Sequence, residues 1–428
     1  MGLMSITYYF TQITFFYGII FIIVKGKTVK IPSFLYLFII YSVYQTIWSF
    51  ANGGFERRGL FQVLVNKDLA AIIFIIMIIY NTDFNERFIK KSILIIKITV
   101  IIAALVSLIQ VVDFSFMDSN PIWANGAVGN TLFGDLYLDR RGSIFGYINQ
   151  NEMGLSYMPL LSVLIGILLY QRYRFYYFFL MLGGISAVLC NARYVMIAFL
   201  LITLQVLIVQ KINIKGLLKF LILISISGFL FIQILLYFGY NFHDWYNTRL
   251  LAEGSLKETT RYKAIGTFLK FFPQHVLFGF GGPTEEMVAA SNAVGSSQIH
   301  VGYLAHLTYF GITGSFFLFG FWFMLAKKLY KTAKLTNYWG SFFAFLTFLW
   351  GNVVMVYFSI FFYGIIFALV LDKYYQDLFL IRNVKDNWIK LENQASVKKK
   401  FKTGSVSTKS VLDDEIWDDN PTRFIKNV

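Results

Sequence analysis

Residues 300–314 read HVGYLAHLTYFGITG, an apolar run that opens on a histidine and ends with the glycines Gly311 and Gly314. The segment before it, 241–300, holds three of the chain's four histidines, scattered charge and the glycine cluster GFGGP at 279–283. Apolar runs flank this polar segment on both sides. The pattern predicts a loop that faces water and is attached to a body of helices in lipid.

The composition of the whole chain argues against a soluble globular protein. Of its 428 residues, 57% are hydrophobic and 14% are charged. Such values are typical of a protein that crosses a membrane several times. Runs long enough, or nearly long enough, to cross about 30 Å of hydrocarbon lie at 4–24, 31–50, 60–80, 92–112, 153–170, 175–191, 194–210, 217–238, 302–326, 338–353 and 356–371. The predicted fold class is an all-α polytopic membrane protein with about eleven (10–12) transmembrane helices.

The distribution of lysine and arginine predicts the orientation of these helices. Every second short loop is rich in basic residues, and such loops face the cytoplasm. The N-terminus then lies outside, as do two long loops, 113–152 and 239–300, the second directly before the ninth helix. We expect a multi-pass protein of the cytoplasmic membrane, with one membrane domain over 1–372 and a cytoplasmic, partly disordered tail over 373–428.

Residue counts argue against a metal site and a nucleic-acid partner. The single cysteine, Cys190, cannot form a disulfide or a thiolate metal site within one chain. Four scattered histidines do not favour a zinc site. The net charge of +15 is largely explained by the basic cytoplasmic loops. We therefore expect no metal, no cofactor and no nucleic acid.

His300 is the first candidate for chemistry. An imidazole at the entry to a bilayer costs free energy unless it is hydrated or partnered, and it is therefore a functional candidate. The alternative is an interfacial histidine that water satisfies. Possible supporting residues are Tyr303, which could orient the imidazole, and Glu285, for which a solvated loop carboxylate is the alternative. Gly311 is interpreted mainly as a site of close helix packing.

Arginines on the predicted outer face form a second group of candidates. They come from three loops: Arg140, Arg141, Arg193 and Arg261. A guanidinium stays charged and matches phosphate oxygens two at a time, so arginines from several loops could hold a lipid diphosphate. The alternative is that each arginine reaches separately to lipid headgroups.

Several short motifs resemble one known family. They are the His300 and Gly311 pair closed by GITG, the segment TTRYKAIGTFLKFFPQHVLFGFGGP at 259–283, RRGSIFGYINQNEMG at 140–154 and NARYVMIAFL at 191–200. Together they are similar to the signature of the O-antigen ligase and O-antigen polymerase (Wzy-type) superfamily. The phase of the Arg-Gly-Ser-Ile-Phe motif favours Arg141 over Arg140 as the matching arginine.

The resemblance implies a metal-independent glycosyltransferase that uses a polyprenyl diphosphate-linked oligosaccharide at the extracytoplasmic face. His300 would be the general base, and the four arginines would hold the diphosphate. We favour a polysaccharide polymerase over an O-antigen-ligase-type enzyme. The alternative from another class is a lipid-linked oligosaccharide flippase or transporter. Expected partners are the lipid-linked oligosaccharide, the bilayer and other polysaccharide assembly proteins.

Overall fold

The computed structural model describes residues 3–52, 67–112, 157–190, 193–211, 260–287, 299, 301–353 and 364–382, with isolated positions between 216 and 237. Side chains are described for these residues except 3–12, 27, 67–68, 110–112, 193 and 260–263. Every regular element in these ranges is a helix. In chain order they are α1 (Leu3–Lys25), η1 (Gly26–Thr28), α2 (Ser33–Ala51), α5 (Lys67–Tyr80), α6 (Glu86–Val112), α9 (Met158–Tyr170), α10 (Tyr176–Leu189), α11 (Arg193–Gln210), α14 (Thr260–Phe271), η7 (Phe272–Gln274), α16 (Gly302–Thr336), α17 (Gly340–Asn352) and a helix over 364–382.

Three of these helices have the length and composition of membrane-crossing segments: Ser33–Ala51, Glu86–Ile109 and Gly302–Thr336. Five shorter apolar helices accompany them. Apolar side chains face outward, such as Ile23 on α1, which is 73% exposed, and Leu94 on α6, which is 55% exposed. Large apolar surfaces of this kind suit contact with lipid. The described part of the chain is that of an all-helical membrane protein, while the number of about eleven crossings and the domain limits stay predictions.

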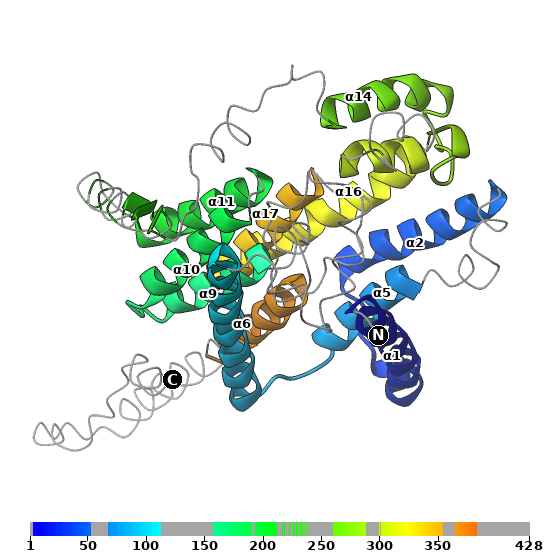
Figure 1. The fold of residues 1–428 in the computed structure, drawn as a ribbon. Helices are drawn as coiled ribbons and strands as arrows, with labels where there is room; N and C mark the ends of the chain where they lie inside the picture. Colours follow the sequence, from blue (N-terminus) through cyan, green and yellow to red (C-terminus); the bar gives the residue numbers. More distant parts are fainter. Residues whose placement is uncertain are drawn as a thin grey trace, which may run out of the picture.

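Helix α9 lies at the centre of one group of helices. Every residue from Met158 to Leu169 is buried, as expected for a helix that is apolar on all sides. Its neighbours are α6, α10, α11 and α17 (Figure 1). The Ser162 hydroxyl donates to the Gln205 side-chain oxygen of α11 at 2.8 Å. Polar contacts of this kind join helices where water is absent.

The close packing of α9 against α17 depends on Gly166. A Cβ atom added there would lie less than 3.0 Å from the backbone of Gly340. Backbone cannot move aside as a flexible side chain can, so we expect Gly166→Ala to lower the free energy of unfolding by about 1–3 kcal/mol. Titration with sodium dodecyl sulfate in mixed micelles measures this quantity. Gly266→Ala in α14 is the matched control, because a Cβ atom there meets nothing within 4 Å. Equal stability of the two variants would contradict the prediction.

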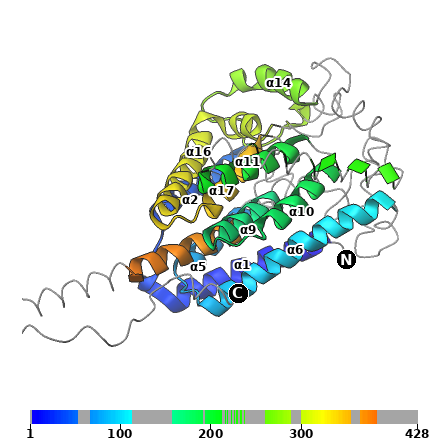
Figure 2. The same ribbon diagram turned by 90° about the vertical axis from the view of Figure 1, so that its left-hand side faces the viewer.

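Helix α16 connects two ends of the molecule. It packs along α2 and also contacts α17. Helix α14 lies near the first residues of α16, whereas the helix 364–382 lies near its last residues (Figures 1 and 2). The segment 260–287 and the helix 364–382 therefore lie at opposite ends of α16.

Candidate functional site

Helix α16 is broken at Gly311. This residue has φ 63° and ψ −170° within an otherwise helical segment, a conformation that is open to glycine and strained for other residues. The break divides α16 into a first part, 302–310, and a second part, 312–336, which point in different directions (Figure 1). Backbone groups that would pair four residues apart in a continuous helix lose their partners here.

The loop 275–282 supplies partners to the backbone groups that the break sets free. Four hydrogen bonds join them: Ile312 N–H to Val276 O at 2.9 Å, Thr313 N–H to Leu277 O at 3.0 Å, Phe280 N–H to Thr308 O at 3.2 Å, and Gly281 N–H to Tyr309 O at 2.7 Å. An unpaired backbone group in lipid costs several kcal/mol. The loop therefore makes the break in α16 energetically tolerable.

The glycine cluster GFGGP lets this loop approach the helix closely. Gly279 has φ 70°, and a Cβ atom there would lie less than 3.0 Å from the backbone of residues 309–311. A Cβ atom on Gly311 would likewise meet the backbone of Leu277. The sequence predicts close packing at Gly311. The structure shows that its backbone packs against this loop and that it also breaks the helix, which a continuous apolar run does not reveal.

Helix α2 holds the loop from the other side. The bonds are Tyr44 hydroxyl to Phe278 O at 2.8 Å and to Phe310 O at 3.1 Å, Trp48 Nε1 to Gly279 O at 3.0 Å, and Ser49 hydroxyl to Gly281 O at 2.6 Å. The Phe310 carbonyl lies directly before the break at Gly311. Sequence reasoning missed these residues, because nothing in their pattern separates them from the aromatic and hydroxyl residues that are common in membrane helices.

Several predicted site residues fall outside what the structure describes. His300, Arg140 and Arg141 lie outside the described residues, and the predicted contacts of their side chains stay predictions. Arg193 is the first residue of α11 and Arg261 is the second residue of α14. For these two arginines the structure describes the backbone and not the side chain.

The end of α17 joins the starts of α11 and α16. The Tyr303 hydroxyl donates to the Leu349 carbonyl at 2.7 Å, and Trp350 Nε1 donates to the Tyr194 carbonyl at 2.9 Å. Leu349 and Trp350 are neighbours in α17. They bind Tyr194, which directly follows the predicted Arg193, and Tyr303, which lies three positions after the predicted base His300. Because the Tyr303 hydroxyl gives its hydrogen to a carbonyl, it can act toward an imidazole only as an acceptor.

Helix α14 is attached to the loop 275–282 by ring and charge contacts. Phe271 packs edge-on against Phe280, with ring centroids 6.2 Å apart. Lys270 forms an ion pair with Glu286 at 3.6 Å, and both side chains are mostly exposed, so this pair contributes about 0–1 kcal/mol. Glu285, the predicted supporting carboxylate, is exposed in the short helical segment 285–287 after the loop. The ring contact therefore contributes more to the attachment than the charges do.

His306 is buried in the first part of α16. It is 7% exposed, and its Nδ1 lies 3.3 Å from the Tyr41 hydroxyl of α2. Its Nε2 atom has no hydrogen-bond partner among the residues that the structure describes. The rings of Phe310 and Trp322 lie beside the imidazole. This surrounding is apolar, unlike that of a solvated loop histidine.

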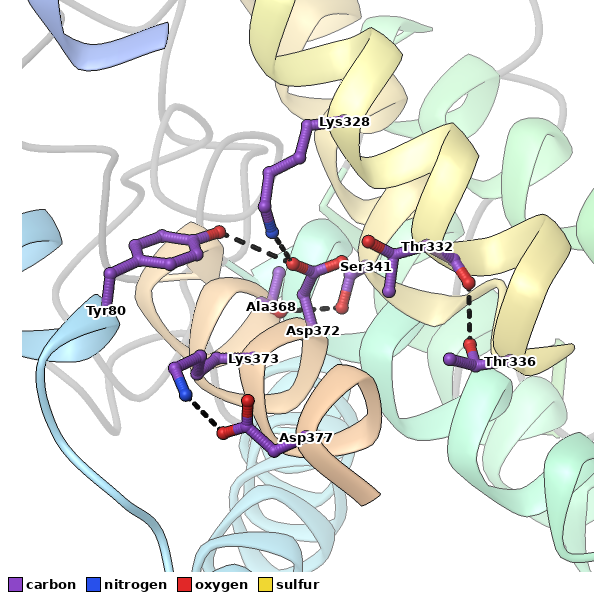
Figure 3. Close-up of polar contacts among 9 residues, drawn as sticks. All are labelled: Tyr80, Lys328, Thr332, Thr336, Ser341, Ala368, Asp372, Lys373 and Asp377. Carbon is purple, nitrogen blue, oxygen red and sulfur yellow. Dashed lines mark hydrogen bonds and ion pairs between the residues drawn. The ribbon is translucent and has the colours of Figure 1, made fainter. Parts of the chain in front are cut away.

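A buried ion pair lies at the other end of α16. Asp372 of the helix 364–382 is 1% exposed and pairs with Lys328 of α16. The Tyr80 hydroxyl of α5 donates to the same carboxylate at 3.3 Å, and the ammonium lies 4.5 Å from the centroid of that ring. Figure 3 shows the ammonium and the hydroxyl both directed at Asp372. The group joins three helices, and the only sequence signal is an aspartate that directly follows the apolar run ending at 371.

Nothing in the described ranges has the arrangement of a metal site, which would need at least three His, Cys, Asp or Glu side chains together. No family model matches the chain. Among curated proteins, too, none matches it. The function must therefore be argued from the motifs and the geometry.

Proposed function

We propose that the chain is a membrane glycosyltransferase that polymerises polyprenyl diphosphate-linked oligosaccharide units at the extracytoplasmic face. The motifs around Arg141, Arg193, Arg261 and His300 support this through their resemblance to the O-antigen ligase and polymerase superfamily. The structural observation that carries the proposal is at the end of α17. Its neighbouring residues Leu349 and Trp350 bind the starts of α16 and α11, so two helices from motifs that are far apart in the chain start beside the same end of α17.

The residue types suit the transfer of a glycosyl group from a diphosphate. The acceptor hydroxyl oxygen forms a bond to the anomeric carbon, and the bond from that carbon to the diphosphate oxygen breaks. His300 takes the hydroxyl proton, a role that suits a group with a pKa near neutral. The arginines stabilise the negative charge that develops on the leaving lipid diphosphate. Every atom and charge in this step is accounted for without a metal ion.

The broken helix and the buried ion pair favour one alternative, a lipid-linked oligosaccharide flippase or transporter. In transporters the ends of discontinuous helices face the cargo, and intramembrane charges mark its path. At Gly311, however, the amides of Ile312 and Thr313 donate to loop carbonyls. Because these groups are occupied, they are not offered to a cargo. This difference favours the enzyme.

Reconstitution tests the proposed function directly. We expect the purified protein in proteoliposomes, given lipid-linked oligosaccharides isolated from the membranes of its own host, to lengthen the glycan in the presence of EDTA. His300→Ala is expected to slow the initial rate by about a hundredfold or more, because the general base is lost. Gel analysis of the labelled glycan measures chain length and rate.

Two controls complete this experiment. His243→Ala makes the same change at another histidine of the same predicted loop and should leave the rate close to that of the wild type. Translocation of a fluorescent lipid-linked oligosaccharide is measured in the same vesicles. Translocation without any lengthening would contradict the glycosyltransferase and favour the transporter. His300→Ala acting at the wild-type rate would contradict the role of His300 as the base and would indicate another base.

A further inference from the structure

We infer that Tyr44 is a positioning residue of the proposed transferase. Its hydroxyl holds the loop 275–282 in the break of α16 and thereby fixes the first part of that helix, which starts two residues after His300. The hydrogen bonds from Tyr44 to the Phe278 and Phe310 carbonyls are called the Tyr44 clamp below. The positioning role rests on the proposed function, whereas the clamp itself is independent of it.

The Tyr44 clamp spans the two pieces that must stay together. The Phe278 carbonyl belongs to the loop, and the Phe310 carbonyl belongs to the first part of α16. A phenolic hydroxyl has one hydrogen, which here lies between two acceptors at 2.8 and 3.1 Å. Removing it takes one hydrogen bond away from both the Phe278 carbonyl and the Phe310 carbonyl. The lost hydrogen bonds are therefore those at the contact between the loop 275–282 and the first part of α16.

Surrounding contacts fix the direction of the Tyr44 ring. It stacks on Trp48 with ring planes 12° apart, and the Trp48 indole itself donates to the loop at Gly279 O. Gly314 leaves room for the ring, because a Cβ atom there would lie 2.6 Å from Tyr44 Cε1. A phenylalanine keeps both the stacking and this fit. Tyr44→Phe thus removes the hydroxyl and little else.

The first part of α16 acts as a short lever between two attachments. At its start, Tyr303 binds the Leu349 carbonyl of α17. At its end, the break is held by the loop and by Tyr44. If the second attachment loosens, the first part of α16 can turn about the first attachment, and His300, two residues before the helix, turns with it. A shift of about 1 Å in a catalytic group can cost about a hundredfold in rate.

The activity measurement uses the reconstitution assay with lipid-linked oligosaccharides from the host membranes. We expect Tyr44→Phe to lower kcat by about tenfold, between the effect of one lost hydrogen bond and that of a 1 Å shift. KM for the donor should change little, because the arginines of other loops hold the diphosphate. Because a loss of folded protein would also lower the apparent kcat at an unchanged KM, the rate is expressed per amount of folded protein. Tyr36→Phe is the matched control, since that tyrosine lies on the same helix and is 52% exposed.

Hydrogen–deuterium exchange tests the Tyr44 clamp through the protection of backbone amides, and it needs no transfer reaction. The amides of Phe280, Gly281, Ile312 and Thr313 bond across the joint, so peptides covering 276–282 and 308–314 should exchange about tenfold faster in Tyr44→Phe. Tyr36→Phe should match the wild type. Unchanged exchange in Tyr44→Phe overturns the clamp. Faster exchange with an unchanged kcat overturns the positioning role. A wild type that transfers no glycan overturns the proposed function and the positioning role with it, while exchange still decides on the clamp.

Discussion

Lys328→Met is expected to lower the free energy of unfolding by about 3 kcal/mol. The change leaves the Asp372 carboxylate, which is 1% exposed, without its cation. A buried charge that loses its partner is costly, and the Tyr80 hydroxyl alone cannot replace an ammonium. Part of the cost is relieved because Asp372 can take up a proton and because the Lys328 side chain is 22% exposed. We therefore expect a loss of stability at the lower end of what the removal of one partner from a buried ion pair costs.

Two further variants separate this effect from a general loss of helix packing. Lys327→Met makes the same change at the preceding, exposed lysine and should be nearly neutral. Lys328→Met combined with Asp372→Leu removes both charges and should recover most of the stability, because an apolar pair can replace a buried ion pair. All three are measured by unfolding in mixed detergent micelles. A double variant as unstable as Lys328→Met would show that the charge pair is not the cause.

Gly311→Ala is expected to be at least as damaging, at about 4 kcal/mol. The backbone at φ 63° and ψ −170° is open almost only to glycine, which by itself costs about 1–3 kcal/mol for alanine. The added Cβ would also lie less than 3.0 Å from the Leu277 backbone, and overpacking of this kind costs about 1–3 kcal/mol more. Detergent unfolding measures the loss, and hydrogen exchange at 276–282 should show that the loop has separated.

The same helix provides the matched control for Gly311→Ala. Gly320 has no left-handed backbone, and a Cβ atom there meets only the end of the Leu37 side chain, at 3.0 Å. That side chain can rotate away, so Gly320→Ala is expected to cost little. If both variants lose the same stability, the special backbone at Gly311 is not the reason.

Hydropathy predicts the apolar helices well and their charged ends poorly. The expected runs 175–191 and 194–210 agree closely with α10 (Tyr176–Leu189) and α11 (Arg193–Gln210). The expected run 302–326 ends ten residues before α16 does. In its last turns Leu325, Leu329 and Ala333 are buried. The exposed lysines there are Lys327, Lys331 and Lys334. An amphipathic end of this kind lowers the average hydropathy without ending the helix.

For the candidate site, the sequence indicates single residues but not the contacts between residues that are far apart in the chain. The glycines of GFGGP and Gly311 are visible in the sequence, but their use becomes clear only when the loop meets the break. The Tyr44 contact with Phe278 joins residues 234 positions apart, and no periodicity predicts such a pair. The Asp372–Lys328 ion pair is also not predictable, because an isolated aspartate after an apolar run does not indicate which basic residue it pairs with. His300, Arg140 and Arg141 stay predictions from motifs.

The break in α16 also suggests an order of events during biosynthesis. The groups that repair it, the loop 275–282 and the side chains of α2, all precede Gly311 in the chain. They have already left the ribosome when the first part of α16 emerges, so this joint can close while synthesis continues. Asp372 emerges 44 residues after Lys328. Until then Lys328 has no Asp372 carboxylate to pair with, and this end of α16 is held by fewer contacts than in the finished protein.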